Sequence, residues 1–372
     1  MSMNMLDNHN KISTWQRAIS IALLAQVVSF FFFSAALWMP PSRRFVEQYE
    51  PLTHNPWTNE IAFSSQTRHR ILGPAIAHYL GIHGFASALI PVAAGTLMLF
   101  MTYLIALRLA DTSWATWTTF LVATTQAFIS SQTWFGYQDA MGGAAVAACF
   151  LVRRSWLGAV FLFLGMLAEE RCAVAIPFIV IWHFDNGQPD RWKRGLFWSV
   201  WLCAAVAVWV MYYTYAHSHF LTAEQLTDQG NYAGVRLLKQ NIGVLPIAFF
   251  ESIRGGWIII GYALFLMLQR KNYLVCLGCT LGIAAGLVQA GMVGDVSRTA
   301  SVIWPMLLIA VRELYRQPEH HSMTLLKVAV LLNILSPCYQ VLAPVDLKYN
   351  LPQTLQCYYP LPFSLARWLI GF

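Results

Sequence analysis

Four short motifs place acids and arginines between long apolar runs of the chain. They are TRHRILGP at 67–74, WFGYQDAMGG at 134–143, LAEERCAVAIP at 167–177 and GDVSRTASVIWP at 294–305. A carboxylate held near a reacting hydroxyl can act as a general base, and a guanidinium can bind phosphate through two parallel hydrogen bonds. Charges at membrane depth are costly unless they are paired or line a wet cavity. The motifs therefore predict a set of charges gathered on one side of a membrane.

The first two motifs each leave two interpretations open. Arg68 and Arg70 lie just before Pro74, where they would either recognise phosphate or contact anionic lipid. Tyr137 and Asp139 precede a stretch of small residues that predicts a helix. Asp139 is then either the N-cap of that helix, a site residue or both.

The last two motifs also have alternative interpretations. If a helix continues through LAEERCA, Glu170 and Arg171 lie about 100° apart and cannot both face lipid cheaply. They are either an inward-facing functional pair or part of a tight interfacial turn. Asp295 and Arg298 either cap a helix and complete a charged cavity, or close on each other and face lipid headgroups.

The segment between the first two apolar runs supplies further acids. Glu47, Glu50 and Glu60 lie in this segment, and their spacing alone does not select one as a base. No metal site is predicted, because the HSH and HH pairs of the sequence come with no convincing third ligand. No cofactor is predicted, and a divalent metal ion has no support in the sequence.

The composition is that of a membrane protein. Of the 372 residues 57% are hydrophobic and only 11% are charged, and the mean hydropathy is +0.51. A soluble domain has about 25% charged residues. The net charge of +7 comes without a basic block, which argues against nucleic acid as a partner. The sequence predicts an all-α fold: a polytopic integral membrane helical bundle in the lipid bilayer.

We expect about 10–11 membrane segments, three or four of them too short to cross alone. They cover 18–38, 86–109, 114–131, 141–152, 156–168, 172–183, 196–215, 242–268, 273–293, 301–311 and 324–342. The whole chain, 1–372, is expected to form a single transmembrane domain. Its first extracytoplasmic loop is placed at 39–70, a second larger outer loop at 216–241, and a C-terminal tail at 343–372.

Basic residues set the orientation of such a bundle. With the N-terminus in the cytoplasm, each expected inner loop carries at least one base. The bases on the opposite face are also numerous, so the bias is modest. In this orientation the four charged motifs all fall at the outer face, on the same side as the loop at 39–70.

The order of the motifs RILGP, YQDAM, AEERCAVAIP and DVSRTASVIWP carries a resemblance over residues 15–315. It resembles that of bacterial polytopic membrane proteins related to the GT-C superfamily of glycosyltransferases. In those proteins an Arg-x-Leu-x-x-Pro-like element follows the first outer loop, a Tyr-x-Asp element opens a middle helix, and a late Arg heads another. The resemblance implies a GT-C-like bundle in the bacterial inner (cytoplasmic) membrane.

The same resemblance implies an activity and roles for the charged residues. GT-C proteins transfer a sugar from a polyprenyl-phosphate donor to a glycan or lipid acceptor at the outer face. Glu60 or Glu50 would be the base, and Asp139 and Glu170 would support it or the acceptor. Arg70, Arg171 and Arg298 would neutralise the donor phosphate, together with the other candidate binding residues Arg68, Tyr137 and Asp295. The sequence departs from the superfamily in one respect, because its first outer loop has no aspartate.

Two other classes of function remain open. The chain is alternatively a non-enzymatic transporter or flippase of a lipid-linked or anionic substrate, which would carry charges deep in its spans. It is alternatively a membrane assembly subunit whose outer charges bind a partner protein. Only the glycosyltransferase would make and break covalent bonds in its substrate, which distinguishes it from the transporter and from the assembly subunit.

Overall fold

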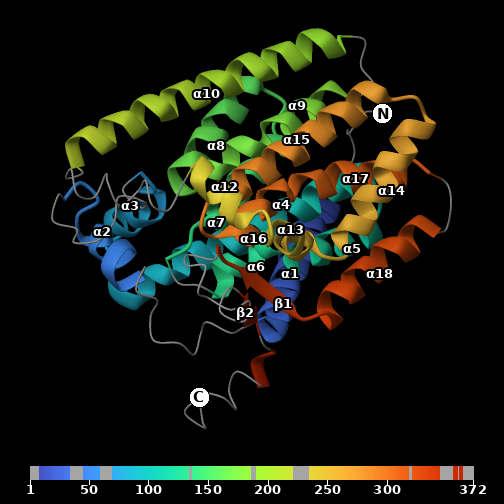
Figure 1. Cartoon of the computed structure of the whole chain (residues 1–372). Coiled ribbons are helices and arrows are strands. Elements are labelled where there is room, and N and C mark those ends of the chain that lie inside the picture. The colour runs from blue at the N-terminus through green and yellow to red at the C-terminus, as the bar shows by residue number, and fades with distance from the viewer. Residues whose placement is uncertain are drawn as a thin grey trace.

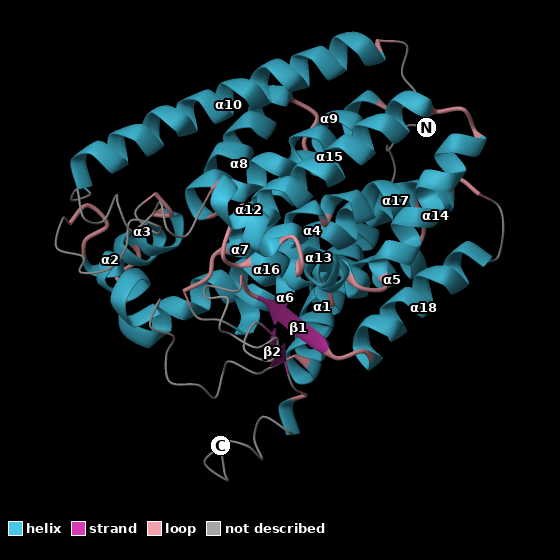
Figure 2. Ribbon diagram, viewed as in Figure 1, coloured by secondary structure: helices cyan, strands magenta, loops and turns pink. Residues whose placement is uncertain are grey.

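A computed structural model gives the fold of the chain (Figure 1). It describes residues 8–33, 45–58, 69–133, 136–185, 190–220, 234–317, 321–343, 355–358 and 360–362. Within these ranges the protein is helical, apart from a pair of short strands (Figure 2).

The helices of the first half of the chain lead into the charged motifs. They are α1 (Asn8–Phe32), η1 (Phe45–Tyr49), α2 (Glu50–His54), α3 (Leu72–Tyr79), η3 (Gly84–Ala88), α4 (Leu89–Leu109), α5 (Thr112–Ala123), α6 (Gln126–Thr133), α7 (Asp139–Leu151), α8 (Ser155–Ala168), η4 (Glu170–Ala175) and α9 (Ile176–Phe184).

The second half adds a long peripheral helix and closes the bundle. Its elements are α10 (Arg191–Phe220), α12 (Val235–Asn241), α13 (Leu245–Ile253), α14 (Gly256–Gln269), α15 (Tyr273–Gly291), α16 (Val296–Ala300), η5 (Ser301–Ile303), α17 (Pro305–Tyr315), α18 (His321–Leu335), β1 (Cys338–Val341) and β2 (Leu355–Tyr358). Figure 1 shows α10 lying along the outside of the bundle, over α8 and α9.

Within the described residues four helices are long and apolar enough to cross a membrane, fewer than the 10–11 membrane segments expected. They cover Ser13–Phe32, Gly84–Leu109, Arg191–His219 and Tyr273–Gly291. A fifth candidate is the pair α13 and α14, which is bent by 89° at its break. Three shorter apolar helices, α7, α8 and α18, lie beside them. These candidate spans indicate an integral membrane protein.

The segment expected as one helix over 114–131 is broken in two. Helix α5 ends at Ala123 and α6 begins at Gln126. The hydroxyl of Thr124 donates to the carbonyl oxygen of Leu121 (3.0 Å), and that of Thr125 donates to Val122 (2.7 Å). Threonine hydroxyls that bond to nearby carbonyls compete with the helical hydrogen-bond ladder. The hydropathy of the sequence therefore does not predict the break between α5 and α6.

The expected segment 242–268 is also broken. Arg254 has a φ of 44° between α13 and α14, a conformation that few residues other than glycine adopt. The NH of the following residue, Gly255, donates to the side-chain oxygen of Asn333 at 2.6 Å. A contact with another helix therefore replaces the hydrogen bond that a continuous helix would have made.

The fold is all-α as expected, but a two-stranded sheet lies near the end of the chain, where the segment over 324–342 was expected to be helical. The segment expected over 324–342 stops being helical after Leu335, and β1 follows it. Strand β1 pairs antiparallel with β2, Tyr339 opposite Cys357 (Figure 2). Part of the expected C-terminal tail therefore docks back on the bundle through backbone hydrogen bonds.

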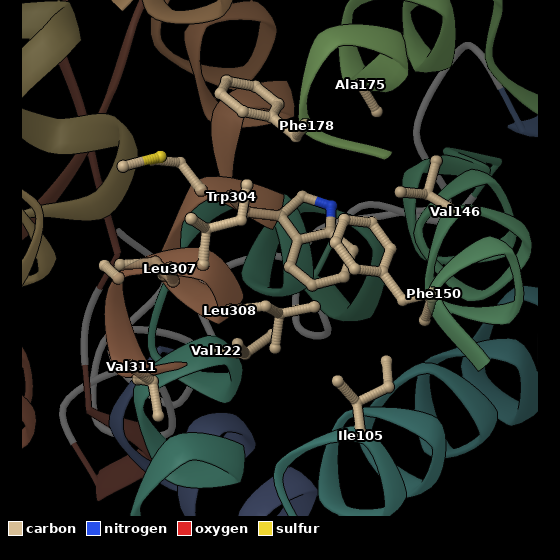
Figure 3. Packing of buried hydrophobic residues seen from close by; sticks show 14 of the residues in the cluster. Ile105, Val122, Val146, Phe150, Ala175, Phe178, Trp304, Leu307, Leu308 and Val311 are labelled. Carbon is tan, nitrogen blue, oxygen red and sulfur yellow. The ribbon is translucent and has the colours of Figure 1, made fainter. Parts of the chain in front are cut away.

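The apolar core fills the space between α4, α5, α7, α9 and α17. Figure 3 shows the ring of Trp304, at the start of α17, beside the ring of Phe150 of α7, with Leu308 and Val122 below Trp304 and Ile105 lower in the view. These side chains are at most 3% exposed. The core therefore fixes the relative positions of the helices that begin or end at the charged motifs.

Gly158→Ala is expected to destabilise the packing of α8 against α10 by about 1–3 kcal/mol. A methyl group at Gly158 would lie 2.1 Å from the Trp198 ring, which is itself 1% exposed and held by stacking on His183 at 3.7 Å. Thermal unfolding in detergent checks this, with Gly261→Ala as the control, because a methyl group there meets nothing within 4 Å. An equal effect of the two changes would contradict the packing argument.

Candidate functional site

The charged motifs meet in a network that begins at Arg70. Its Nη2 donates to Glu170 Oε1 at 2.5 Å and its Nε to Glu170 Oε2 at 2.7 Å. Its Nη1 lies 3.0 Å from Glu169 Oε2. Arg70 therefore joins two consecutive carboxylates that lie at the junction of α8 and η4, one hundred residues further along the chain.

Arg171 forms the centre of the network. Its Nε donates to Glu169, its Nη2 to Asp139 Oδ1 at 3.1 Å, and its Nη1 to the Thr299 hydroxyl at 2.5 Å. Arg171 is 3% exposed. Its guanidinium faces inward, but its acidic partners are Glu169 and Asp139 rather than the neighbouring Glu170, so Glu170 and Arg171 do not form a pair with each other.

Arg298 closes the network from α16. Its Nη1 donates to both carboxylate oxygens of Asp139, at 3.0 and 3.1 Å, and its Nε donates to Asp295 at 2.5 Å. The guanidinium also lies over the ring of Tyr137, 4.1 Å from its centroid. Asp295 holds the N-cap position of α16 without a capping hydrogen bond from its side chain. The two motifs at 134–143 and 294–305 are thus joined directly.

Asp139 is not the N-cap of α7. Gln138 holds that position, and Asp139 is the first residue of the helix. Its carboxylate is occupied by Arg171 and Arg298. The N-cap interpretation of Asp139 is therefore wrong, and its role as a site residue stays a prediction.

Among the described residues, the resulting ion-pair network contains four carboxylates and three guanidiniums. Its members are Arg70, Asp139, Glu169, Glu170, Arg171, Asp295 and Arg298. Counting His69 as neutral, three positive and four negative charges leave a net charge of −1. The network is closed at its centre and most open at Glu170, Asp295 and Arg70, whose side chains are 24%, 16% and 11% exposed.

The short element η4 explains how two neighbouring glutamates share Arg70, although only Glu169 also reaches Arg171. Glu169 follows α8 with an extended backbone (φ −154°, ψ 103°), and a 3₁₀ turn begins at Glu170. An extended residue next to a turn sends consecutive side chains in different directions. Glu169 therefore reaches Arg171 as well as Arg70, while Glu170 contacts Arg70 and His69.

Glu170 is held in its charged form. Burial by itself would raise its pKa, but the Arg70 guanidinium and then His69 hold the pKa of this carboxyl well below its usual range. The Nε2 of His69 lies 3.0 Å from Glu170 Oε2. On its other side His69 lies against Tyr213 and His217 of α10, with ring centroids 5.1 and 5.8 Å away. Glu170 thus connects the network to the end of the long outer helix.

The C-terminal sheet supports the network from its other edge. Gln340 of β1 donates to Asp295 Oδ2 at 3.0 Å, and its own side-chain oxygen accepts from the Tyr358 hydroxyl of β2 at 3.1 Å. The NH of Val341 donates to the hydroxyl of Ser297 at 2.8 Å. The sheet therefore fixes Asp295 and, through it, the orientation of Arg298.

A cavity of about 20 Å³ lies beneath the network. Its lining includes the two carboxylates Asp139 and Glu169 together with apolar side chains such as Trp304 and Val146. This volume is enough for about one water molecule. In the part of the chain that the structure describes, no group of three His, Cys, Asp or Glu side chains is arranged to hold a metal ion.

The structure brings together most of the residues that the sequence singles out. Arg70, Tyr137, Asp139, Glu170, Arg171, Asp295 and Arg298 all take part in the network. Glu50 lies on α2, where its carboxylate pairs with His54 at 2.8 Å instead. Glu60 and Arg68 lie outside the described residues.

Several members of the site were missed as candidates. Glu169 lies in the AEER motif, from which only the adjacent Glu170 was selected as a candidate acid. His69 lies between the two arginines of the TRHR motif. Thr299 follows Arg298 directly. These three residues lie inside the quoted motifs and could have been selected from them, whereas nothing in the local sequence indicates Gln340.

Comparisons with known proteins add no family to this picture. No family model matches the chain, and no curated protein or solved structure shows significant similarity to it. The class defined by the fold is that of a helical protein with four to five candidate membrane spans.

Proposed function

We propose that the chain is an integral-membrane glycosyltransferase of GT-C-like design that takes a sugar from a lipid-phosphate donor at the extracytoplasmic face. The observation that carries the proposal is the ion-pair network. Four segments far apart in the sequence deliver three guanidiniums and four carboxylates to one end of the bundle. Such a set provides both of the groups that the transfer needs, a phosphate-binding cation and a proton acceptor.

Arg70 is the guanidinium that we propose meets the donor phosphate. It is the most exposed of the three arginines, and it already holds a carboxylate with two donors, the geometry in which guanidinium also binds phosphate. A phosphate taking this place releases Glu170, because the network has more carboxylates than guanidiniums. Binding of the donor thereby frees a base.

The proposed reaction is a displacement at the anomeric carbon of the sugar. The acceptor hydroxyl forms the new bond to this carbon as the bond to the lipid-phosphate oxygen breaks. Its proton passes to the freed Glu170, with Glu50 and Glu60 as the alternative bases, and the lipid phosphate leaves on Arg70. Arg171 and Arg298 hold Asp139 and Glu169 in place during the exchange.

Arg70→Gln is expected to lower consumption of a polyprenyl-phosphate-linked sugar at least about 100-fold, because it removes a charged donor to the leaving group. The measurement is turnover of the donor by protein reconstituted in liposomes, with Arg236→Gln of the exposed face of α12 as the matched control. Unchanged turnover in Arg70→Gln at equal protein level would overturn the role given to Arg70. Arg70 is a sharper choice than the deeply buried Arg298, whose loss also threatens folding.

One observation favours the transporter or flippase as a second candidate. A second ion-pair network lies at the opposite ends of α9 and α17, where Arg312 meets Asp185 at 2.8 Å and Arg270 meets Glu313 at 3.2 Å. A transporter needs a gate at each end of its substrate pathway. Ion-pair networks at both ends of the same helices could form two such gates. Movement of a lipid-linked sugar across reconstituted vesicles without any bond change would support this candidate over the transferase.

A further inference from the structure

Six basic side chains gather at the end of the bundle opposite the ion-pair network. This basic patch consists of Arg108, Arg153, Arg154, Arg191, Lys193 and Arg194, and all but Arg194 are exposed. None of the six forms an ion pair with an acid among the described residues. The contrast with Arg70, Arg171 and Arg298, which are all paired, raises the question of what balances their charge.

Three elements bring the patch together. The Nη1 of Arg108, in the last turn of α4, donates to the carbonyl of Leu151 at 2.7 Å, two residues before Arg153. Arg153 is close enough to act on Arg108 as a like charge. The end of α4 therefore lies against the connection between α7 and α8, with bases on both sides of the contact.

The beginning of α10 joins the same region. His183 stacks on Trp198 of α10 at 3.7 Å, and its Nε2 lies 2.9 Å from the carbonyl oxygen of Cys149 in the last turn of α7. Trp198 in turn packs on Gly158 of α8. The bases at 191–194 thus lie at the same end of the bundle as Arg153 and Arg154.

The acids near the patch do not balance it. Asp111 is the N-cap of α5, where its carboxylate accepts hydrogen bonds from the NH groups of Ser113 and Trp114. Asp190 is exposed just before α10. Asp185, next to the Phe184 ring that Arg191 covers, pairs with Arg312 and Arg316 instead. Among the described residues, the six bases of the patch against Asp111 and Asp190 therefore leave a net charge of +4.

Exposed tryptophans place this surface at the edge of a bilayer. Trp156 and Trp192 are 44% and 64% exposed, and each stands within two residues of an arginine of the patch. Tryptophan prefers the membrane interface, at the level of the lipid headgroups. We propose that the basic patch binds anionic phospholipid headgroups and that these lipids neutralise it. The proposal does not depend on the transferase activity.

Native mass spectrometry in detergent, with phosphatidylglycerol and phosphatidylcholine of equal chain length added separately, tests the proposal. The wild type is expected to bind phosphatidylglycerol more tightly. Each basic residue near an anionic surface contributes about fivefold, so the pair of changes Arg153→Gln and Arg154→Gln is expected to weaken binding about 30-fold. Arg191→Gln with Lys193→Gln should act similarly.

The matched control removes two exposed bases from α12, as Arg236→Gln with Lys239→Gln, and is expected to leave phosphatidylglycerol binding within about twofold. Equal binding of the two lipids by the wild type would overturn the proposal. So would an equal loss in the control, which would show a general charge effect. Inorganic phosphate that competes as well as phosphatidylglycerol would instead point to a soluble anion and would also overturn it.

Discussion

Arg171→Met is expected to lower the free energy of unfolding by about 3–5 kcal/mol, the cost of removing one partner from a buried ion pair. Arg171 is 3% exposed and holds Asp139 and Glu169, so its loss leaves two guanidiniums against four carboxylates. A methionine fills a similar volume without charge. The loss of stability therefore measures the charge imbalance rather than a cavity.

A second change in the same network separates these two causes. The pair Arg171→Met with Glu169→Gln restores the native net charge of −1, and we expect it to recover more than half of the lost stability. Denaturant unfolding followed by tryptophan fluorescence in detergent measures both variants, with Arg236→Met as the exposed control. If the double variant is no more stable than Arg171→Met, packing rather than charge explains the loss.

Arg254→Met is expected to cost at least about 3 kcal/mol, because hydrogen bonds to a charged group contribute about 1.5–3 kcal/mol each. Nη1 of this side chain donates to the carbonyls of Asn333 (2.7 Å) and Ser336 (3.3 Å) at the end of α18, and Nη2 donates to Thr124 at the end of α5. Arg254 is 1% exposed. It therefore satisfies the last carbonyls of two helices beside the break between α13 and α14.

Arg254→Gly is expected to be more stable than Arg254→Met, although it removes more atoms. Arg254 has a φ of 44°, where a side chain costs about 1–3 kcal/mol that glycine avoids. The expected order of thermal stability is arginine, lysine, glycine, methionine, since lysine keeps the charge but reaches fewer carbonyls. A methionine variant as stable as the wild type would show that the carbonyls find other partners.

Hydropathy and charge were enough to predict the class of the protein and the convergence of the charged motifs. Apolar runs of this length have no stable place except a membrane or a large core, and the four candidate spans agree with that. The alternation of spans placed the four motifs at one end, and Arg70, Asp139, Glu170, Arg171 and Arg298 do meet there. The convergence of the motifs was therefore predicted correctly, but the 10–11 membrane segments on which that prediction rested are not confirmed, because the described residues contain four to five candidate spans.

The breaks in the helices and the pairing of charges depended on the tertiary structure. The pairing of acids with arginines depends on the backbone angles of single residues, such as Glu169 with its extended backbone. The hydropathy of the sequence does not predict these angles. The local sequence predicts contacts only between residues that are close to each other on one helix. The pairing of Arg70 with Glu170, one hundred residues away, is decided by packing between helices.

The C-terminal sheet shows the same limit most clearly. The sequence of β1 predicts the end of an apolar span. Instead, β1 pairs with β2 and places Gln340 within hydrogen-bond distance of Asp295. A strand is stable only with its partner present, so its formation depends on a segment beyond any local window. The sequence by itself determined a membrane bundle with its charges at one end. The tertiary structure decided that these charges pair with one another in a single network, because only packed helices bring distant side chains within hydrogen-bond distance.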